Sequence, residues 1–205
     1  MKLTAIFESW LVPDGNYPPL HRGQLVNLSF QIRPQTLEQV GQESVEIFEN
    51  LQDAEYRFAA RVLRVYGEER IVAAEALGFR FFLENLGIDK APEGATLFGN
   101  GGLYVDYYRW VENVERRHNP PDLFHTLRVT RIRQVQLPQE YLSRNDLGGS
   151  AWPTYVGPDK YRTSAIKDLH TMEGQPFSTE FYLVDFDNKG LRGASVPRTF
   201  LSTQA

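Results

Sequence analysis

Gln24-Leu25-Val26-Asn27-Leu28-Ser29-Phe30-Gln31-Ile32 is the stretch that decides the fold. Its apolar side chains alternate with polar ones from Val26 to Ile32. Because successive side chains of a strand point to opposite faces of a sheet, the alternation predicts a strand with one buried and one exposed face. Such a strand is typical of antiparallel sheets, which pack one face on a core and leave the other to water.

Several later segments have the same extended character, rich in β-branched and aromatic residues. We expect strands over residues 3–11, 45–48, 54–66, 103–111, 124–137 and 181–186. Shifts in the phase of the alternation predict a bulge near residue 63 and another between residues 129 and 132. Turns are expected at 67–69 and at Asn100-Gly101-Gly102, and short helices at 36–39 and 163–172.

Residues 70–86 fit two interpretations. Apolar residues at odd-numbered positions favour a strand, whereas the alanines and glutamates favour a helix. The strand is preferred because Phe79-Arg80-Phe81-Phe82 is typical of strands.

The expected fold is mainly β and antiparallel. It is either a partly open barrel of the oligonucleotide- and oligosaccharide-binding kind (OB-like) or a small sandwich, with one or two short helices and an irregular C-terminal extension. Residues 1–137 form the β-rich core domain in this interpretation. Residues 138–205 form a loop-rich extension with a late strand, expected to pack on the same core.

Composition limits the classes of protein that this chain can be. It has 205 residues, 41% hydrophobic and 23% charged, so one sizeable core is expected. It has no cysteine, which excludes disulfides, thiolate metal sites and a cysteine nucleophile. The first eight residues are not typical of a signal peptide, no apolar run reaches membrane-spanning length, and we expect a cytoplasmic protein.

Motifs for catalysis are weak. His118, Asp122 and His125 have a spacing that could hold a divalent metal for hydrolysis, but Pro120 and Pro121 prevent a helix from aligning them. No nucleophile elbow and no phosphate-binding loop is present. We therefore predict no catalytic residue, no metal site and no cofactor, and a metal-dependent hydrolase is only the second alternative.

Aromatic and basic residues are the better candidates for binding. Exposed aromatic residues on rigid strands anchor partners. Arginines that alternate with apolar residues on two expected strands could form a basic stripe for single-stranded nucleic acid. These arginines are Arg57, Arg61, Arg64, Arg128, Arg131 and Arg133. The competing interpretations are core packing for the aromatic rings and ion pairs on a solvated face for the arginines. The predicted binding residues are Trp10, Tyr17, His21, Tyr104, Tyr108, Trp110, Arg128 and Arg131.

These observations favour a non-enzymatic binding protein whose partner is another protein, for example an immunity-type protein that neutralises its partner. The net charge of -4 suits a basic partner and disfavours nucleic acid and anionic membranes. An OB-like module for single-stranded nucleic acid or oligosaccharide is the alternative.

Overall fold

The computed structural model describes residues 1–11, 17–40, 45–84, 91–106, 108–136, 162–167, 169, 181–189, 191 and 199. Two short helical turns, η1 (Ser9–Leu11) and η2 (Val111–Glu115), accompany the strands. The strands are β1 (Lys2–Glu8), β2 (Leu25–Leu28), β3 (Phe30–Val40), β4 (Ile47–Gln52), β5 (Glu55–Tyr66), β6 (Ile71–Ala76), β7 (Phe79–Glu84), β8 (Thr96–Val105), β9 (His125–Gln136), β10 (Arg162–Ile166) and β11 (Phe181–Asp187).

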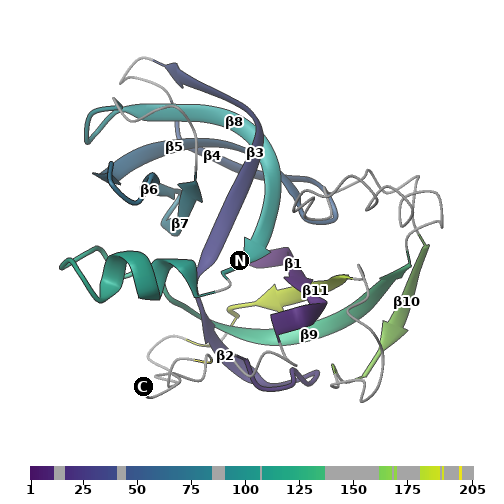
Figure 1. Cartoon of the computed structure of the whole chain (residues 1–205). Helices are drawn as coiled ribbons and strands as arrows, with labels where there is room; N and C mark the ends of the chain where they lie inside the picture. Colours follow the sequence, from purple (N-terminus) through teal and green to yellow (C-terminus); the bar gives the residue numbers. More distant parts are fainter. Residues whose placement is uncertain are drawn as a thin grey trace, which may run out of the picture.

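A five-stranded barrel forms one half of the molecule. Its strands follow the order β8-β3-β7-β6-β5, and pairing of β5 with β8 closes the ring. The β3–β7 pair is parallel and the other barrel pairs are antiparallel. Strand β4 extends the sheet beside β5, and Figure 1 shows these strands curving around the upper half of the molecule.

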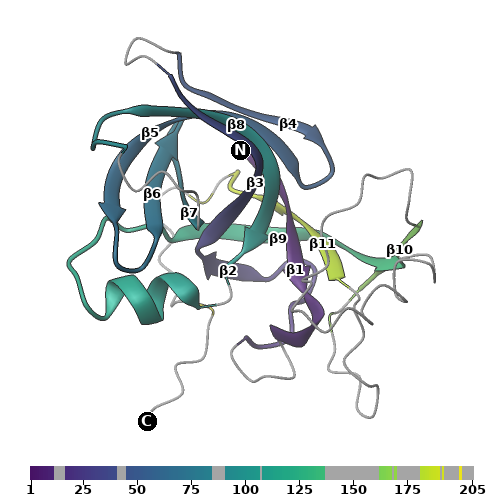
Figure 2. The ribbon, with the colours of Figure 1, turned by 45° about the horizontal axis from the view of Figure 1, so that its top comes forward.

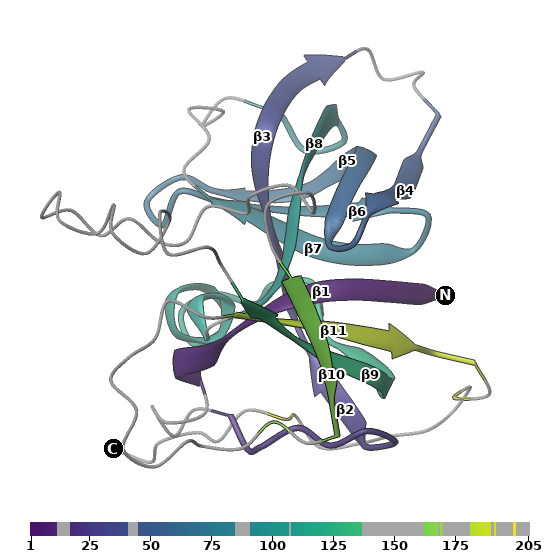
Figure 3. The same ribbon diagram turned by 90° about the vertical axis from the view of Figure 1, so that its right-hand side faces the viewer.

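The same hydrogen-bonded sheet continues from the barrel into the strands of the other half, β1, β2, β9, β10 and β11, which are called the second sheet below. Strand β9 pairs with β2, β10 and β11, and β11 in turn pairs with β1. Strand β1 also joins the barrel through a short parallel pairing with β8, Ile6 opposite Tyr104. Figure 3 shows the second sheet beneath the barrel, and β3 and β8 run from the barrel to meet it.

The two halves share one hydrophobic core. Val26 and Leu28 of β2 and Phe30 and Ile32 of β3 are all fully buried in it. The alternating stretch therefore runs on from the second sheet into the barrel, and its only break is at Ser29. Phe30 contacts both halves, since its ring lies 5.6 Å from that of Phe79 in the barrel and 5.8 Å from that of Phe186 in β11.

The segment that carries η2 covers the outer face of β6 and β7. Trp110 and Val114 pack there against Ile71, Ala73 and Phe82. The Trp110 ring is stacked on Phe82, with centroids 5.8 Å apart. Both faces of the β6–β7 hairpin are thus buried, one in the barrel and one under this segment. Figure 2 shows the helical segment next to β6 and β7.

The mainly β fold with a barrel is confirmed, and it differs from a partly open barrel because β5 and β8 close it. Both predicted bulges are present, since the β5–β6 register shifts between Val62 and Arg64 and the β9–β11 register shifts beside Thr130. Residues 70–86 contain two strands, β6 and β7, joined by a turn at Leu77 and Gly78.

Other local predictions are wrong. Residues 36–39 continue β3, and residues 162–166 form β10, where helices were expected. The expected strand 103–111 ends at Val105 and a helical turn follows. Asn100-Gly101-Gly102 lies inside β8, and its glycines allow close approach of β3: a Cβ on Gly101 would lie under 3.0 Å from the backbone of Arg33. Residues 138–161 lie outside the described residues, and the domain boundary at 137 stays a prediction.

Candidate binding surface

Two of the predicted binding residues come together where β1 and β8 end. The strands are parallel at the pair Ile6 and Tyr104, so residues four positions further on leave the sheet in the same direction. These residues are Trp10, in η1, and Tyr108, just before η2. Their rings meet edge to face, with centroids 6.3 Å apart and an interplanar angle of 87°, and both are half-buried.

The backbone of Tyr108 has a φ of +74°. This left-handed conformation is unfavourable for a bulky residue and persists only where the surroundings fix it. The carbonyl oxygen of Tyr108 accepts a hydrogen bond from the Glu112 N–H at 3.0 Å, which starts the helical turn. The strained backbone thus turns the chain from β8 into η2 and leaves the Tyr108 ring against Trp10.

Hydrogen bonds to the Asp106 side chain hold this turn in place. Its buried carboxylate accepts hydrogen bonds from the backbone N–H groups of Arg109 at 2.9 Å and Trp110 at 3.3 Å, and from the Ser29 hydroxyl at 3.0 Å. Desolvation by burial raises the pKa of this carboxyl to about 7, although the three hydrogen bonds lower it. Asp106 was not among the residues predicted from the sequence, although a carboxylate three residues before a helical segment was an available signal.

Tyr17 supports the same turn from the core. Its hydroxyl donates a 2.5 Å hydrogen bond to the carbonyl oxygen of Asp106, and its ring packs edge to face on Phe7 at 5.7 Å. Burial raises the pKa of the Tyr17 phenol well above its usual value, so the hydroxyl stays protonated and donates. Tyr17 is only 3% exposed, which favours the core-packing interpretation of this residue.

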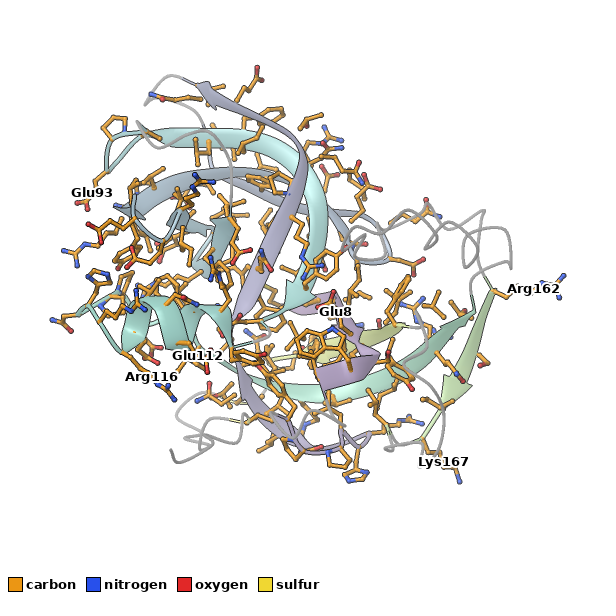
Figure 4. All side chains as sticks on the ribbon, in the orientation of Figure 1. Glu8, Glu93, Glu112, Arg116, Arg162 and Lys167 are labelled. Carbon is orange, nitrogen blue, oxygen red and sulfur yellow. The ribbon has the colours of Figure 1, made fainter. Side chains whose placement is uncertain are left out.

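The other predicted aromatic residues do not join this surface. Trp110 is fully buried against Phe82, and Tyr104 is 4% exposed. The guanidinium of Arg33 lies 3.9 Å over the Tyr104 ring and is held there by Glu8, whose carboxylate oxygens accept bonds of 2.9 and 3.2 Å. Figure 4 labels Glu8 close to the junction of β1 and β8.

The predicted polar residues are dispersed. His21 is exposed, and its backbone N–H donates to the side chain of Gln24 at 2.8 Å. Arg128 and Arg131 are exposed on β9, where their register partners are Asp187 and Asp185 of β11. They lie in the second sheet, apart from the Trp10–Tyr108 pair.

The predicted basic stripe required the arginines of β5 and β9 to lie side by side, but these two strands are not neighbours in the sheet. On β5, acidic groups lie close to the arginines: Arg57 lies 3.7 Å from Glu49 and Arg61 lies 3.4 Å from Glu75. On β9, Arg133 pairs with Asp53 at 2.5 Å and with Asp185 at 3.0 Å. This pattern favours the ion-pair interpretation.

The three residues with metal-like spacing also have separate partners. His118 Nε2 lies 3.0 Å from Glu69, the Asp122 carboxylate accepts the N–H of Phe124, and His125 Nε2 lies 2.8 Å from the carbonyl oxygen of Arg80. Within the described part of the chain, no group of three or more histidine, aspartate or glutamate side chains could hold a metal ion.

Comparison with other proteins gives no assignment: no family model, no curated protein and no solved structure matches this chain. The fold therefore defines only a class, a closed five-stranded barrel joined to a second sheet. In the described ranges, no helix is long and apolar enough to cross a membrane.

Proposed function

We propose that this protein is a non-enzymatic cytoplasmic binding protein that holds another protein at the surface formed by Trp10 and Tyr108. The observation that carries the proposal is the strained Tyr108 backbone, which presents a half-buried aromatic ring beside a second one. Tryptophan and tyrosine are enriched among the residues that dominate binding energy at protein interfaces. Strained backbone conformations also cluster at functional sites.

Rigidity supports this assignment. The Asp106 carboxylate and the edge-to-face contact with Trp10 hold the segment, so little side-chain entropy would be lost when a partner binds. The surface is built from two strand ends that are far apart in the sequence, which makes it a property of the folded chain.

Charge indicates the kind of partner. The chain has a net charge of -4, and acidic proteins associate fastest with basic partners because the long-range field steers the encounter. A protein that neutralises a basic partner, in the manner of an immunity protein, fits this description. The described residues give no arrangement that favours the nucleic-acid or hydrolase alternatives, so neither is proposed.

The test is affinity capture from an extract of the native host, with the purified chain immobilised and the retained proteins quantified. Trp10→Ala and Tyr108→Ala should each lower retention of the partner at least tenfold, the loss of about 1.4 kcal/mol or more. Val45→Ala is the matched control, because Val45 is 79% exposed and lies on the approach to β4. Equal retention by all variants, with folding verified by circular dichroism, would exclude this surface.

A further inference from the structure

A cleft of about 430 Å³ opens at the other end of β1. Its lining includes Lys2, Thr4, Asn50, Tyr56, Asp185 and Asp187. The volume falls within the roughly 300–1,000 Å³ that is typical of small-molecule sites. Because a strand rises about 3.3 Å per residue, β1 is about 20 Å long from Lys2 to Glu8, with the cleft at its first residues and the Trp10–Tyr108 surface just beyond its last.

Strand register explains why polar groups gather there. Lys2 pairs with Asp187 and Thr4 pairs with Asp185 across antiparallel β1 and β11, so all four side chains share one face of the second sheet. Further along the same face, Ile6, Leu183 and Val135 form an apolar cluster. The face is therefore polar at one end, and Asn50 of β4 and Tyr56 of β5 form the facing wall there.

The polar groups at the base of the cleft are fixed by one another. Asp185 Oδ1 accepts the Thr4 hydroxyl at 2.8 Å and an Arg133 N–H at 3.0 Å, while Arg133 also binds Asp53 at 2.5 Å. The Tyr56 hydroxyl accepts the Thr4 N–H at 2.8 Å. Burial raises the pKa of Tyr56 to about 12, so this group is a neutral phenol.

The arrangement is amphoteric. Lys2 offers only donors and the carboxylates of Asp185 and Asp187 offer only acceptors, while Asn50 and Thr130 offer both. Arg133 lies 3.0 Å from the Asp185 carboxylate, and Lys2 is the register partner of Asp187, so charges of both signs lie in this region. A hydroxyl group can donate to a carboxylate and accept from an ammonium or amide.

We propose that this cleft binds a short saccharide, whose adjacent hydroxyls donate to Asp185 and Asp187 and accept from Lys2 and Asn50. The proposal is independent of the protein partner, because the cleft and the Trp10–Tyr108 surface lie at opposite ends of β1.

The test is isothermal titration of the full chain with maltose, cellobiose, lactose and chitobiose as probes, and with glycine as a zwitterionic probe. At least one disaccharide should bind saturably. Lys2→Gln and Asp187→Asn should each raise its Kd about tenfold, because each removes a hydrogen bond to a charged group. Lys167→Gln is the matched control, since Lys167 projects beyond β10 at the edge of the molecule (Figure 4).

Three results would overturn the proposal. One is the absence of saturable binding by every disaccharide at concentrations up to about 50 mM. Another is disaccharide binding that Lys2→Gln and Asp187→Asn leave unchanged. The third is binding of glycine without any disaccharide, which would assign the cleft to a zwitterion.

Discussion

Tyr108 differs from the other residues of the described chain that have a positive φ and are not glycine. Asp53, Arg70 and Leu77 all lie in turns between consecutive strands, where a left-handed residue is common. Tyr108 instead lies between a strand and a helical turn, with its ring against Trp10. The strained backbone of Tyr108 therefore holds its ring in the Trp10–Tyr108 pair, and for this reason we assign the strain to binding.

Two substitutions at Tyr108 separate backbone strain from the contribution of the ring. Tyr108→Ala removes the ring but keeps a Cβ at positive φ. Tyr108→Gly removes the ring and the Cβ, and with the Cβ the backbone strain. Glycine tolerates positive φ, so Tyr108→Gly should be more stable than Tyr108→Ala by about 1 kcal/mol in urea unfolding. Both variants should lose the partner equally. An alanine variant that is the more stable of the two would show that the backbone is not strained.

Asp106 predicts a pH dependence of stability. Burial raises the pKa of its carboxyl from 3.8 to about 7, so between these values the folded protein holds a proton that the unfolded chain releases. The stabilisation from this group is complete below about pH 4 and is lost as the pH rises through about 7.

Asp106→Asn removes this dependence. From about pH 4 to pH 8, the free energy of unfolding of the variant relative to wild type should rise by up to roughly 4 kcal/mol. Asp122→Asn is the control, because Asp122 is exposed and its carboxylate also accepts a backbone N–H. A difference between wild type and Asp106→Asn that is constant with pH would contradict the assignment.

Among the described strands, β8 is the one whose close packing against a neighbour requires glycine. It pairs with β3 on one side and β5 on the other, and a Cβ on Gly99 would lie under 3.0 Å from the carbonyl oxygen of Thr36. A Cβ on Gly101 would meet the backbone of Arg33 and Pro34 in the same way. Since backbone atoms cannot move aside as a side chain can, these glycines set the spacing between β8 and β3 in the barrel.

Gly101→Ala should therefore destabilise the protein by about 2 kcal/mol or more, with part of the loss from displaced strand pairing. Gly67→Ala is the matched control, because a Cβ there meets nothing within 4 Å and its φ is not positive. Thermal unfolding of the two variants checks the prediction. Equal melting temperatures would show that β3 can move without cost.

The same glycines show where sequence analysis succeeds and where it does not. Alternation of apolar and polar residues predicted β5, β9 and both bulges, because it reports which face of a strand is buried. Strand β11 was predicted instead from a short run that is apolar on both faces. Asn100-Gly101-Gly102 is typical of a turn, and only the close approach of β3 explains glycine within a strand.

The candidate surface was predictable only in its parts. Trp10 and Tyr108 could be named as aromatic candidates, but their contact depends on the parallel pairing of Ile6 with Tyr104, which joins positions nearly a hundred residues apart. Local patterns carry no information about such a pairing. The cleft depends likewise on the register of β1 with β11, which comes from the opposite end of the chain.

At the scale of the whole molecule, the shared core predicts that the barrel and the second sheet unfold together. Phe30 is fully buried between Phe79 of the barrel and Phe186 of the second sheet. Arg133 adds a polar link, since it joins Asp53 in the β4–β5 turn to Asp185 of β11. Neither half can therefore lose its structure without exposing core surface of the other.

Phe30→Ala tests this coupling. The substitution should lower the free energy of unfolding by about 3–5 kcal/mol and leave one transition that coincides in tryptophan fluorescence and far-ultraviolet circular dichroism. Phe48→Ala is the comparison, because Phe48 is half-buried and packs on Tyr56, Phe79 and Phe81 within the barrel. Phe48→Ala should lower the free energy of unfolding by less, and its transition should also stay single. If the halves form one cooperative unit, loss of the shared Phe30 ring destabilises both at once. Two separated transitions in the Phe30→Ala protein would instead mean that the halves unfold independently.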